Sequence, residues 1–130
     1  MNKLTFVLIL ALGVGLIGFL AALPDKPGAY DDLAQCITDS GAVFYGAFWC
    51  QTCTRQKSEF GKSASLLPYE ECSTTDRKDQ LQICKDKNIK SYPTWEFSNG
   101  ERLTGSLSRE DLTRLTGCDA GLSVATTTSD

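Results

Sequence analysis

The longest run of apolar residues lies near the N-terminus. Residues 4–23 comprise sixteen apolar residues, three glycines and one threonine, without a charge. Twenty helical residues at about 1.5 Å per residue reach about 30 Å, the thickness of the hydrocarbon core of a membrane. The pattern predicts a transmembrane anchor over residues 1–23, followed by a short tether over residues 24–29, which contain two prolines and a glycine.

A cleaved secretory signal is the alternative for this segment. The apolar region of a signal is usually about 7 to 15 residues long, and cleavage needs small residues at positions −3 and −1. Cleavage after Ala21 or Ala22 would place Phe19 or Leu20 at position −3. We therefore expect a retained anchor.

The charges on either side of this segment indicate its orientation. Lys3 precedes it, whereas three aspartates follow it, at positions 25, 31 and 32. Cytoplasmic flanks of membrane spans carry an excess of Lys and Arg. We expect a single-pass protein of the cell membrane, with a cytoplasmic N-terminus and the rest of the chain outside the cytoplasm.

The remaining chain alternates between helical and extended patterns. Residues 30–38 carry apolar side chains at helical spacing, and the uncharged run 42–49 predicts a strand buried on both faces, at the centre of a sheet. Cys53, Phe60 and Leu67 share one face of a helix predicted over residues 51–66. The later patterns predict a strand over residues 68–72 and a helix over residues 79–87. A hairpin follows, with strands over 94–97 and 101–105 and with Asn99-Gly100 in a type I′ turn. A last helix begins at Ser108 and ends at Gly117, and residues 119–130 are predicted to form a disordered tail.

The order of these elements predicts one α/β domain over residues 30–118. Two parallel strands joined by a crossover helix, followed by an antiparallel hairpin and a closing helix, give a four-stranded mixed sheet flanked by helices. The composition restricts the reactions and partners that this domain can have, because the chain has no histidine and a net charge of −3. A Ser-His-Asp triad, a Cys-His dyad and a histidine zinc site are excluded, and nothing suggests a nucleic-acid partner.

Cysteine is the residue type left to carry chemistry. Cys50-Gln51-Thr52-Cys53 lies where the buried strand ends and its helix begins. Unpaired amides and the helix dipole stabilise a thiolate at this place, so we expect Cys50 to attack and Cys53 to resolve the mixed disulfide. The alternatives are an inert disulfide or half of a zinc site. The remaining sulfurs form no second C-x-x-C, so we expect no metal.

Three further residues are candidates for binding a substrate. Tyr92-Pro93 precedes the hairpin, where a cis peptide bond would expose backbone for pairing with a substrate strand, against a trans proline that only starts a strand. Trp49, beside Cys50, is expected on a docking surface, and Trp95 in the core.

The segments FYGAFWCQTC, PYEEC and SYPTW resemble thioredoxin-like proteins, over about residues 33–118. More narrowly, they resemble the thioredoxin-like domains fused to, or partnered with, bacterial vitamin K epoxide reductase homologues. Such domains pass electrons from folding substrates to a quinone-reducing membrane enzyme. The resemblance implies Cys50 as nucleophile, Cys53 as resolving thiol, Pro93 as a cis-proline and a structural bridge from Cys72 to Cys84. The alternative for Cys72 and Cys84 is a second shuttle pair.

This resemblance implies a membrane-anchored thiol-disulfide oxidoreductase without a cofactor. Its partners would be exported cysteine-containing proteins and a quinone-reducing oxidase of the vitamin K epoxide reductase type. The alternatives are an anchored reductase or isomerase of the cytochrome c maturation type, and a non-catalytic binding module stapled by disulfides. Gln51 and Thr52 stand where many oxidising members have Pro-His, and Phe44 stands where thioredoxins have a buried acid, so the direction of electron flow stays open.

Cys36 and Cys118 are the remaining cysteines once the other four are paired. Unpaired cysteines are unusual outside the cytoplasm, so we expect a second structural bridge rather than two free thiols. In the entropic model, closing so long a segment stabilises the fold by up to about 4.5 kcal/mol.

Overall fold

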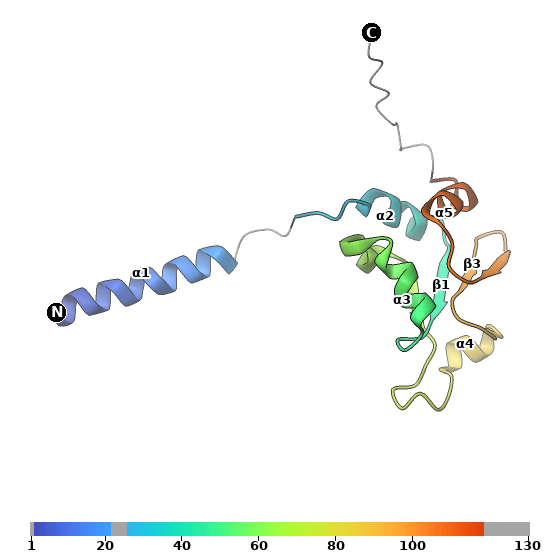
Figure 1. Ribbon diagram of the computed structural model, residues 1–130, viewed down its shortest axis with the longest axis horizontal. Helices are drawn as coiled ribbons and strands as arrows, with labels where there is room; N and C mark the ends of the chain where they lie inside the picture. The colour runs from blue at the N-terminus through green and yellow to red at the C-terminus, as the bar shows by residue number, and fades with distance from the viewer. Residues whose placement is uncertain (1, 22–25, 119–130) are drawn as a thin grey trace, which may run out of the picture.

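The computed structural model describes residues 2–21 and 26–118, and for residues 15–21 the backbone alone. The chain forms a four-stranded mixed sheet in the order β2-β1-β3-β4, with helices on both faces (Figure 1). Strand β1 (Val43–Gly46) runs parallel to β2 (Tyr69–Glu71) and antiparallel to β3 (Thr94–Glu96), which pairs with β4 (Arg102–Thr104). The predicted α/β fold of thioredoxin-like type fits this sheet.

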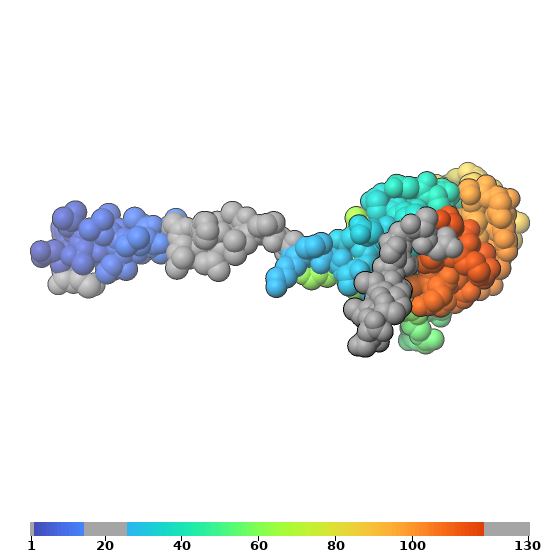
Figure 2. All heavy atoms as spheres, turned by 90° about the horizontal axis from the view of Figure 1, so that it is seen from above, coloured from blue at the N-terminus to red at the C-terminus, as the bar shows by residue number. Residues whose placement is uncertain are grey.

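The N-terminal helix α1 (Lys3–Ala21) lies apart from the sheet (Figure 1). The large apolar side chains of its described part, up to Val14, are exposed, and this part is drawn in blue in Figure 2. By length and hydropathy, no helix among the described residues qualifies as a membrane span. The anchor over residues 4–23 stays a prediction. The tail predicted over residues 119–130 lies outside the described residues, as do residues 24 and 25 of the tether.

The main core lies on one face of the sheet, beneath α2 (Asp31–Asp39), α3 (Gln51–Ser58) and α5 (Arg109–Thr116). Phe44 and Trp95, paired across β1 and β3, are fully buried and stack with ring centroids 4.7 Å apart. Trp95 is therefore a core residue, as predicted. The opposite face holds a smaller cluster, to which α4 (Gln82–Asp86) contributes Cys84.

The helix predicted over residues 51–66 is wrong in its second half. Helix α3 ends at Ser58, and residues Gly61–Leu66 form a 3-10 helix, η1. Gly61 adopts φ +55°, a left-handed conformation that interrupts an α-helix. The resulting change of direction buries Ser63, whose hydroxyl accepts the backbone N–H of Tyr30 over 3.0 Å.

The other predicted boundaries need smaller corrections. Helix α4 begins at Gln82 and not at residue 79, because Gln80 forms a β-bridge with Ser73. The hairpin turn is not of type I′, since Gly100 has φ +82° while Asn99 keeps a negative φ. The Gly100 N–H instead bonds the Phe97 carbonyl over 2.8 Å, in a three-residue loop that ends with a left-handed glycine. Helix α5 begins and ends as predicted, at Ser108 and Gly117.

Candidate functional site

Cys50 and Cys53 lie at the start of α3, directly after the loop that follows β1. Cys50 is the N-cap residue, and its Sγ accepts the backbone N–H of Cys53 over 3.1 Å. The two cysteines are not bonded to each other, and both are buried, with 7% and 2% of their surface exposed. This is the position where amides at a helix N-terminus stabilise a thiolate.

The surroundings of the two thiols differ. Burial and the hydrogen bond with Cys50 raise the pKa of the Cys53 thiol to about 12. Cys53 therefore keeps its proton at neutral pH, whereas the sulfur of Cys50 faces the donors of the helix start. This asymmetry makes Cys50 the sulfur suited to attack first.

Trp49 and Tyr92 form a surface beside Cys50. Trp49 is 43% exposed, and its ring packs edge-on against that of Tyr92, with centroids 6.0 Å apart. The Tyr92-Pro93 peptide bond is cis. The structure thus brings the loop before α3 next to the loop before β3, although about forty residues separate them in the sequence.

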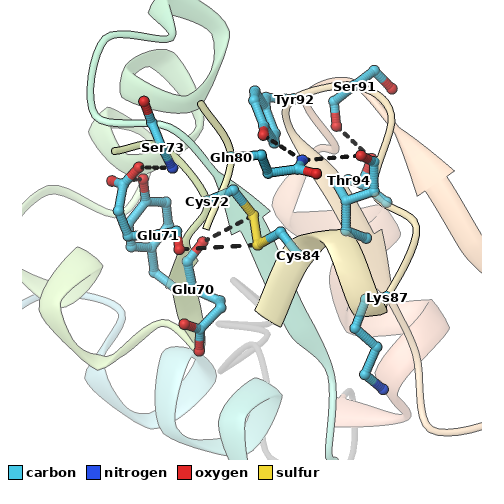
Figure 3. The surroundings of a disulfide bond; sticks show 12 residues. Glu70, Glu71, Cys72, Ser73, Gln80, Cys84, Lys87, Ser91, Tyr92 and Thr94 are labelled. Carbon is cyan, nitrogen blue, oxygen red and sulfur yellow. Dashed lines mark hydrogen bonds between the residues drawn. A yellow bond between two sulfur atoms is a disulfide. The ribbon is translucent and has the colours of Figure 1, made fainter. Parts of the chain in front are cut away.

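Cys72 and Cys84 are joined in a disulfide that encloses a polar loop (Figure 3). Both ends of this loop contact the surface beside Cys50. Ser73 accepts the indole N–H of Trp49 over 2.7 Å, and the Gln80 side-chain amide donates to the Tyr92 hydroxyl over 2.6 Å. The loop therefore positions both aromatic rings, a role that the sequence pattern did not indicate.

A second disulfide joins Cys36 on α2 to Cys118, the residue after the cap of α5. Its two Cα atoms are 5.9 Å apart, within the usual range for such bonds. The bridge holds two helices of the same layer together, far along the chain from each other.

Behind Cys53 lies a polar group that the sequence analysis missed. Tyr69 donates its hydroxyl to Glu71 over 2.8 Å, and the Lys57 ammonium lies 3.2 Å from the centre of the Tyr69 ring. Lys57 comes from α3, and the other two residues share one face of β2. The alternation of side chains along a short strand indicates that Tyr69 and Glu71 share a face. It does not reveal which helix residue packs above that face.

Two other features of the described residues bear on possible ligands. No group of three or more metal-ligating side chains occurs within residues 2–21 and 26–118. A surface pocket beside α2 and η1 includes neither cysteine of the pair, so it does not help to locate the chemistry; its lining residues are Lys26, Pro27, Gly28, Asp31, Lys62, Ser65 and Leu66.

Comparison with known proteins points the same way as the geometry. No family model matches the chain. A curated relative, the thiol-disulfide oxidoreductase LTO1 of Arabidopsis thaliana, is 38% identical over 89 residues. The match covers 65% of this chain but 23% of the relative, so the chain spans less than a quarter of the length of that protein. With the mixed sheet and the unbonded cysteine pair, the similarity supports a thioredoxin-like domain and an oxidoreductase of the thioredoxin type.

Proposed function

We propose that this protein is a thiol-disulfide oxidoreductase that exchanges disulfides with exported proteins through Cys50 and Cys53. The observation that carries the proposal is the contrast among the six cysteines. Four form two disulfides, whereas the pair at the N-terminus of α3 is unbonded. Both of its sulfurs are buried, but the sulfur of Cys50 accepts a backbone N–H and the pKa of the Cys53 thiol is raised. A structural disulfide does not need two sulfurs in different surroundings, but an exchange reaction does.

The exchange follows from the order of the two sulfurs. The Cys50 thiolate attacks a substrate disulfide, forms a mixed disulfide and releases one substrate sulfur as a thiolate. Cys53 then attacks Cys50, and the second substrate sulfur leaves while the Cys50-Cys53 bond forms. Run in reverse, the same steps donate a disulfide to a substrate dithiol. The exposed ring of Trp49 supports docking of the substrate chain beside Cys50.

The membrane anchor and the redox partner are further parts of the proposal. The uncharged sequence of residues 4–23 supports attachment to a membrane, with the domain outside the cytoplasm. The segments FYGAFWCQTC and SYPTW support reoxidation by a quinone-reducing enzyme of the vitamin K epoxide reductase type. Alkaline extraction of membranes tests the anchor: the full chain should stay in the pellet, whereas a chain beginning at Lys26 should be released.

Trapping of mixed disulfides tests the exchange function. In a Cys53→Ala variant the resolving thiol is absent, so substrates should accumulate as disulfides with Cys50 and be visible on non-reducing gels. The matched control is Cys50→Ala, which removes the attacking sulfur and should trap nothing. Equal recovery from both variants, or recovery from neither, would argue against catalysis and for a stapled binding module.

The redox potential of the Cys50-Cys53 pair decides the direction of electron flow. Equilibration with glutathione, followed by alkylation and mass spectrometry, measures it. A value near −120 mV, as in a strong oxidant, would support donation of disulfides, whereas a value near −270 mV, as in thioredoxin, would support a reductase or isomerase. The neutral Gln51 and Thr52 between the cysteines favour a value between these limits.

A further inference from the structure

Cys53 needs a base, because a thiol with its proton does not attack a disulfide. Its pKa is raised to about 12, mainly by burial. Thioredoxins have a buried acid at the position of Phe44, but a phenylalanine ring cannot accept a proton. In this protein the ring is fully buried and stacked on Trp95. The titratable groups around Cys53 come from two elements. At α3, Cys50 and Lys57 act on Cys53 directly. On β2, Tyr69 interacts with Cys53, and Glu71 interacts in turn with Tyr69 and Lys57.

Gly46 allows Tyr69 to approach Cys53. A Cβ atom on Gly46 would lie 2.6 Å from Cε2 of Tyr69 and 3.3 Å from its hydroxyl oxygen, and 3.1 Å from Sγ of Cys53. The tyrosine ring and the thiol therefore border the same small space above β1. A side chain at position 46 would fill that space and separate them.

The carboxyl group of Glu71 is held at the far side of this space. One of its oxygens accepts the Tyr69 hydroxyl over 2.8 Å, and the other accepts the backbone N–H groups of Ser73 over 2.8 Å and Phe48 over 3.3 Å. Burial and the bond to Glu71 raise the pKa of Tyr69, so its hydroxyl keeps its proton and can relay another. Three donors around one carboxylate hold it in a fixed place.

Lys57 supplies a positive charge over the Tyr69 ring that interacts with both the thiol and the carboxylate. Burial lowers its pKa, while the charges of Glu71 and Cys53 act in the opposite direction. Its charge favours the thiolate form of Cys53. Lys57 and Tyr69 also line a surface pocket with Ala64, Ser65 and Leu67, which gives this group a route to solvent.

We propose that Glu71 accepts the proton of Cys53 through the Tyr69 hydroxyl when Cys53 resolves the mixed disulfide. The inference rests on the proposed function and adds the proton step to it. The thiol gives its proton to the Tyr69 oxygen while Tyr69 gives its own to Glu71. The Cys53 thiolate, facing the Lys57 charge, then attacks Cys50. The sulfur–sulfur bond to the substrate breaks as the Cys50-Cys53 bond forms, and the substrate leaves as a thiolate. In the reverse direction Glu71 returns the proton.

A pair of glutamates on one strand provides the test. Glu71→Gln removes the charge but keeps an oxygen for the backbone donors and a partner for Tyr69. Glu70→Gln is the matched control, since Glu70 points to the opposite face of β2, where its charge acts on Tyr45. The reduced full chain, in detergent, is mixed with glutathione disulfide. Acid quenching and mass spectrometry then follow the Cys50-glutathione adduct as it forms and decays, across a range of pH.

The two steps respond differently if Glu71 carries the proton. Formation of the adduct by Cys50 should be unchanged, while its decay through Cys53 should slow about a hundred-fold in Glu71→Gln, a typical contribution of acid–base catalysis. Tyr69→Phe should slow the decay as well, and it serves as the second variant if Glu71→Gln does not fold. Glu71→Gln should also lose the step in the pH profile of decay that belongs to a carboxylate.

The outcomes separate this inference from the proposed function. Decay at the wild-type rate in both Glu71→Gln and Tyr69→Phe would overturn the proton path alone. Equal slowing in Glu70→Gln would also overturn it, because the effect would then come from net charge. A wild-type chain that forms no adduct would overturn the proposed function, and the proton path with it.

Discussion

The indole N–H of Trp49 donates a 2.7 Å hydrogen bond to the hydroxyl of Ser73, and this bond ties the loop before α3 to the loop closed by the Cys72-Cys84 disulfide. The contact holds a half-exposed aromatic ring at a fixed angle next to Cys50. Because Trp49 is the residue proposed to meet the substrate, this bond couples the structural disulfide to the exchange site.

Ser73→Ala should therefore weaken substrate docking without changing the chemistry of the thiols. Loss of a hydrogen bond of this kind costs about 1 kcal/mol, so KM for a disulfide-containing peptide should rise about five-fold. The kcat should stay near the wild-type value, and Trp49 fluorescence should shift to longer wavelength. Ser65→Ala is the control, because Ser65 is an exposed serine on η1 whose hydroxyl donates to the Lys62 carbonyl. An unchanged KM would contradict the role of the bond.

The stability of the reduced protein should fall as the pH rises from 9.0 towards 12. The pKa of Cys53 is raised from 9.0 to about 12 in the folded state. The folded protein thus keeps a proton that the unfolded chain loses in this range, and unfolding is favoured. Below pH 9.0 the stabilisation is fully present. Urea denaturation of the reduced protein at several pH values measures the effect.

Cys53→Ala is the control for that experiment. The pKa values of Tyr45 and Tyr69 are also raised by burial, and they contribute a loss of stability in the same direction. The variant keeps both tyrosines, so the difference between the two curves belongs to the thiol. Parallel curves would show that Cys53 titrates alike in the folded and unfolded states.

The two disulfides should differ in their contribution to stability. Their cysteines are separated by 12 and 82 residues in the sequence. The entropic model then gives about 3 kcal/mol for the Cys72-Cys84 bridge and about 4.5 kcal/mol for the Cys36-Cys118 bridge. Paired alanine substitutions, measured by urea unfolding, should reproduce this order. Removal of the Cys72-Cys84 bridge alone should also raise KM, since Ser73 and Gln80 lie in its loop. The reverse order of stabilities would contradict the entropic account.

Gly46→Ala should destabilise the fold and disturb the resolving step together. The added Cβ would lie 2.6 Å from the Tyr69 ring, and such overpacking typically costs about 1–3 kcal/mol. Displacement of Tyr69 should slow the decay of the Cys50-glutathione adduct. Tyr69→Leu in the Gly46→Ala background should recover stability, because the ring atom in conflict is gone, but it should not recover the rate. Recovery of both would argue that Tyr69 only fills space.

Much of the fold followed from local signals in the chain. The uncharged run 42–49 predicted the central strand, since burial on both faces leaves no place for a charge, and β1 lies within it. Ser108 accepts the Asp111 N–H, and Gly117 is left-handed, so α5 begins and ends where its capping residues stand. These signals act between near neighbours, which is why the sequence reveals them.

Two of the errors came where contacts with other segments outweighed the local pattern. Apolar spacing continued past Ser58, but the left-handed Gly61 turned the chain to bury Ser63 beneath α2. The sequence pattern placed Gln80 in a helix. In the structure its side-chain amide instead donates to the Ile89 carbonyl and the Tyr92 hydroxyl, and its backbone pairs with Ser73. Each partner lies outside the window that periodicity examines.

In the candidate site, too, some features follow from local sequence signals and others from contacts between separate elements. By itself, the sequence determined that Cys50 and Cys53 stand at the junction of a buried strand and a helix, because strand burial, helix start and spacing are all local. The tertiary structure alone decided that Trp49 packs against Tyr92, and that Lys57, Tyr69 and Glu71 gather behind Cys53. These residues come from separate elements, and their meeting depends on how the sheet pairs and where Gly46 leaves room, which no short segment of the chain specifies.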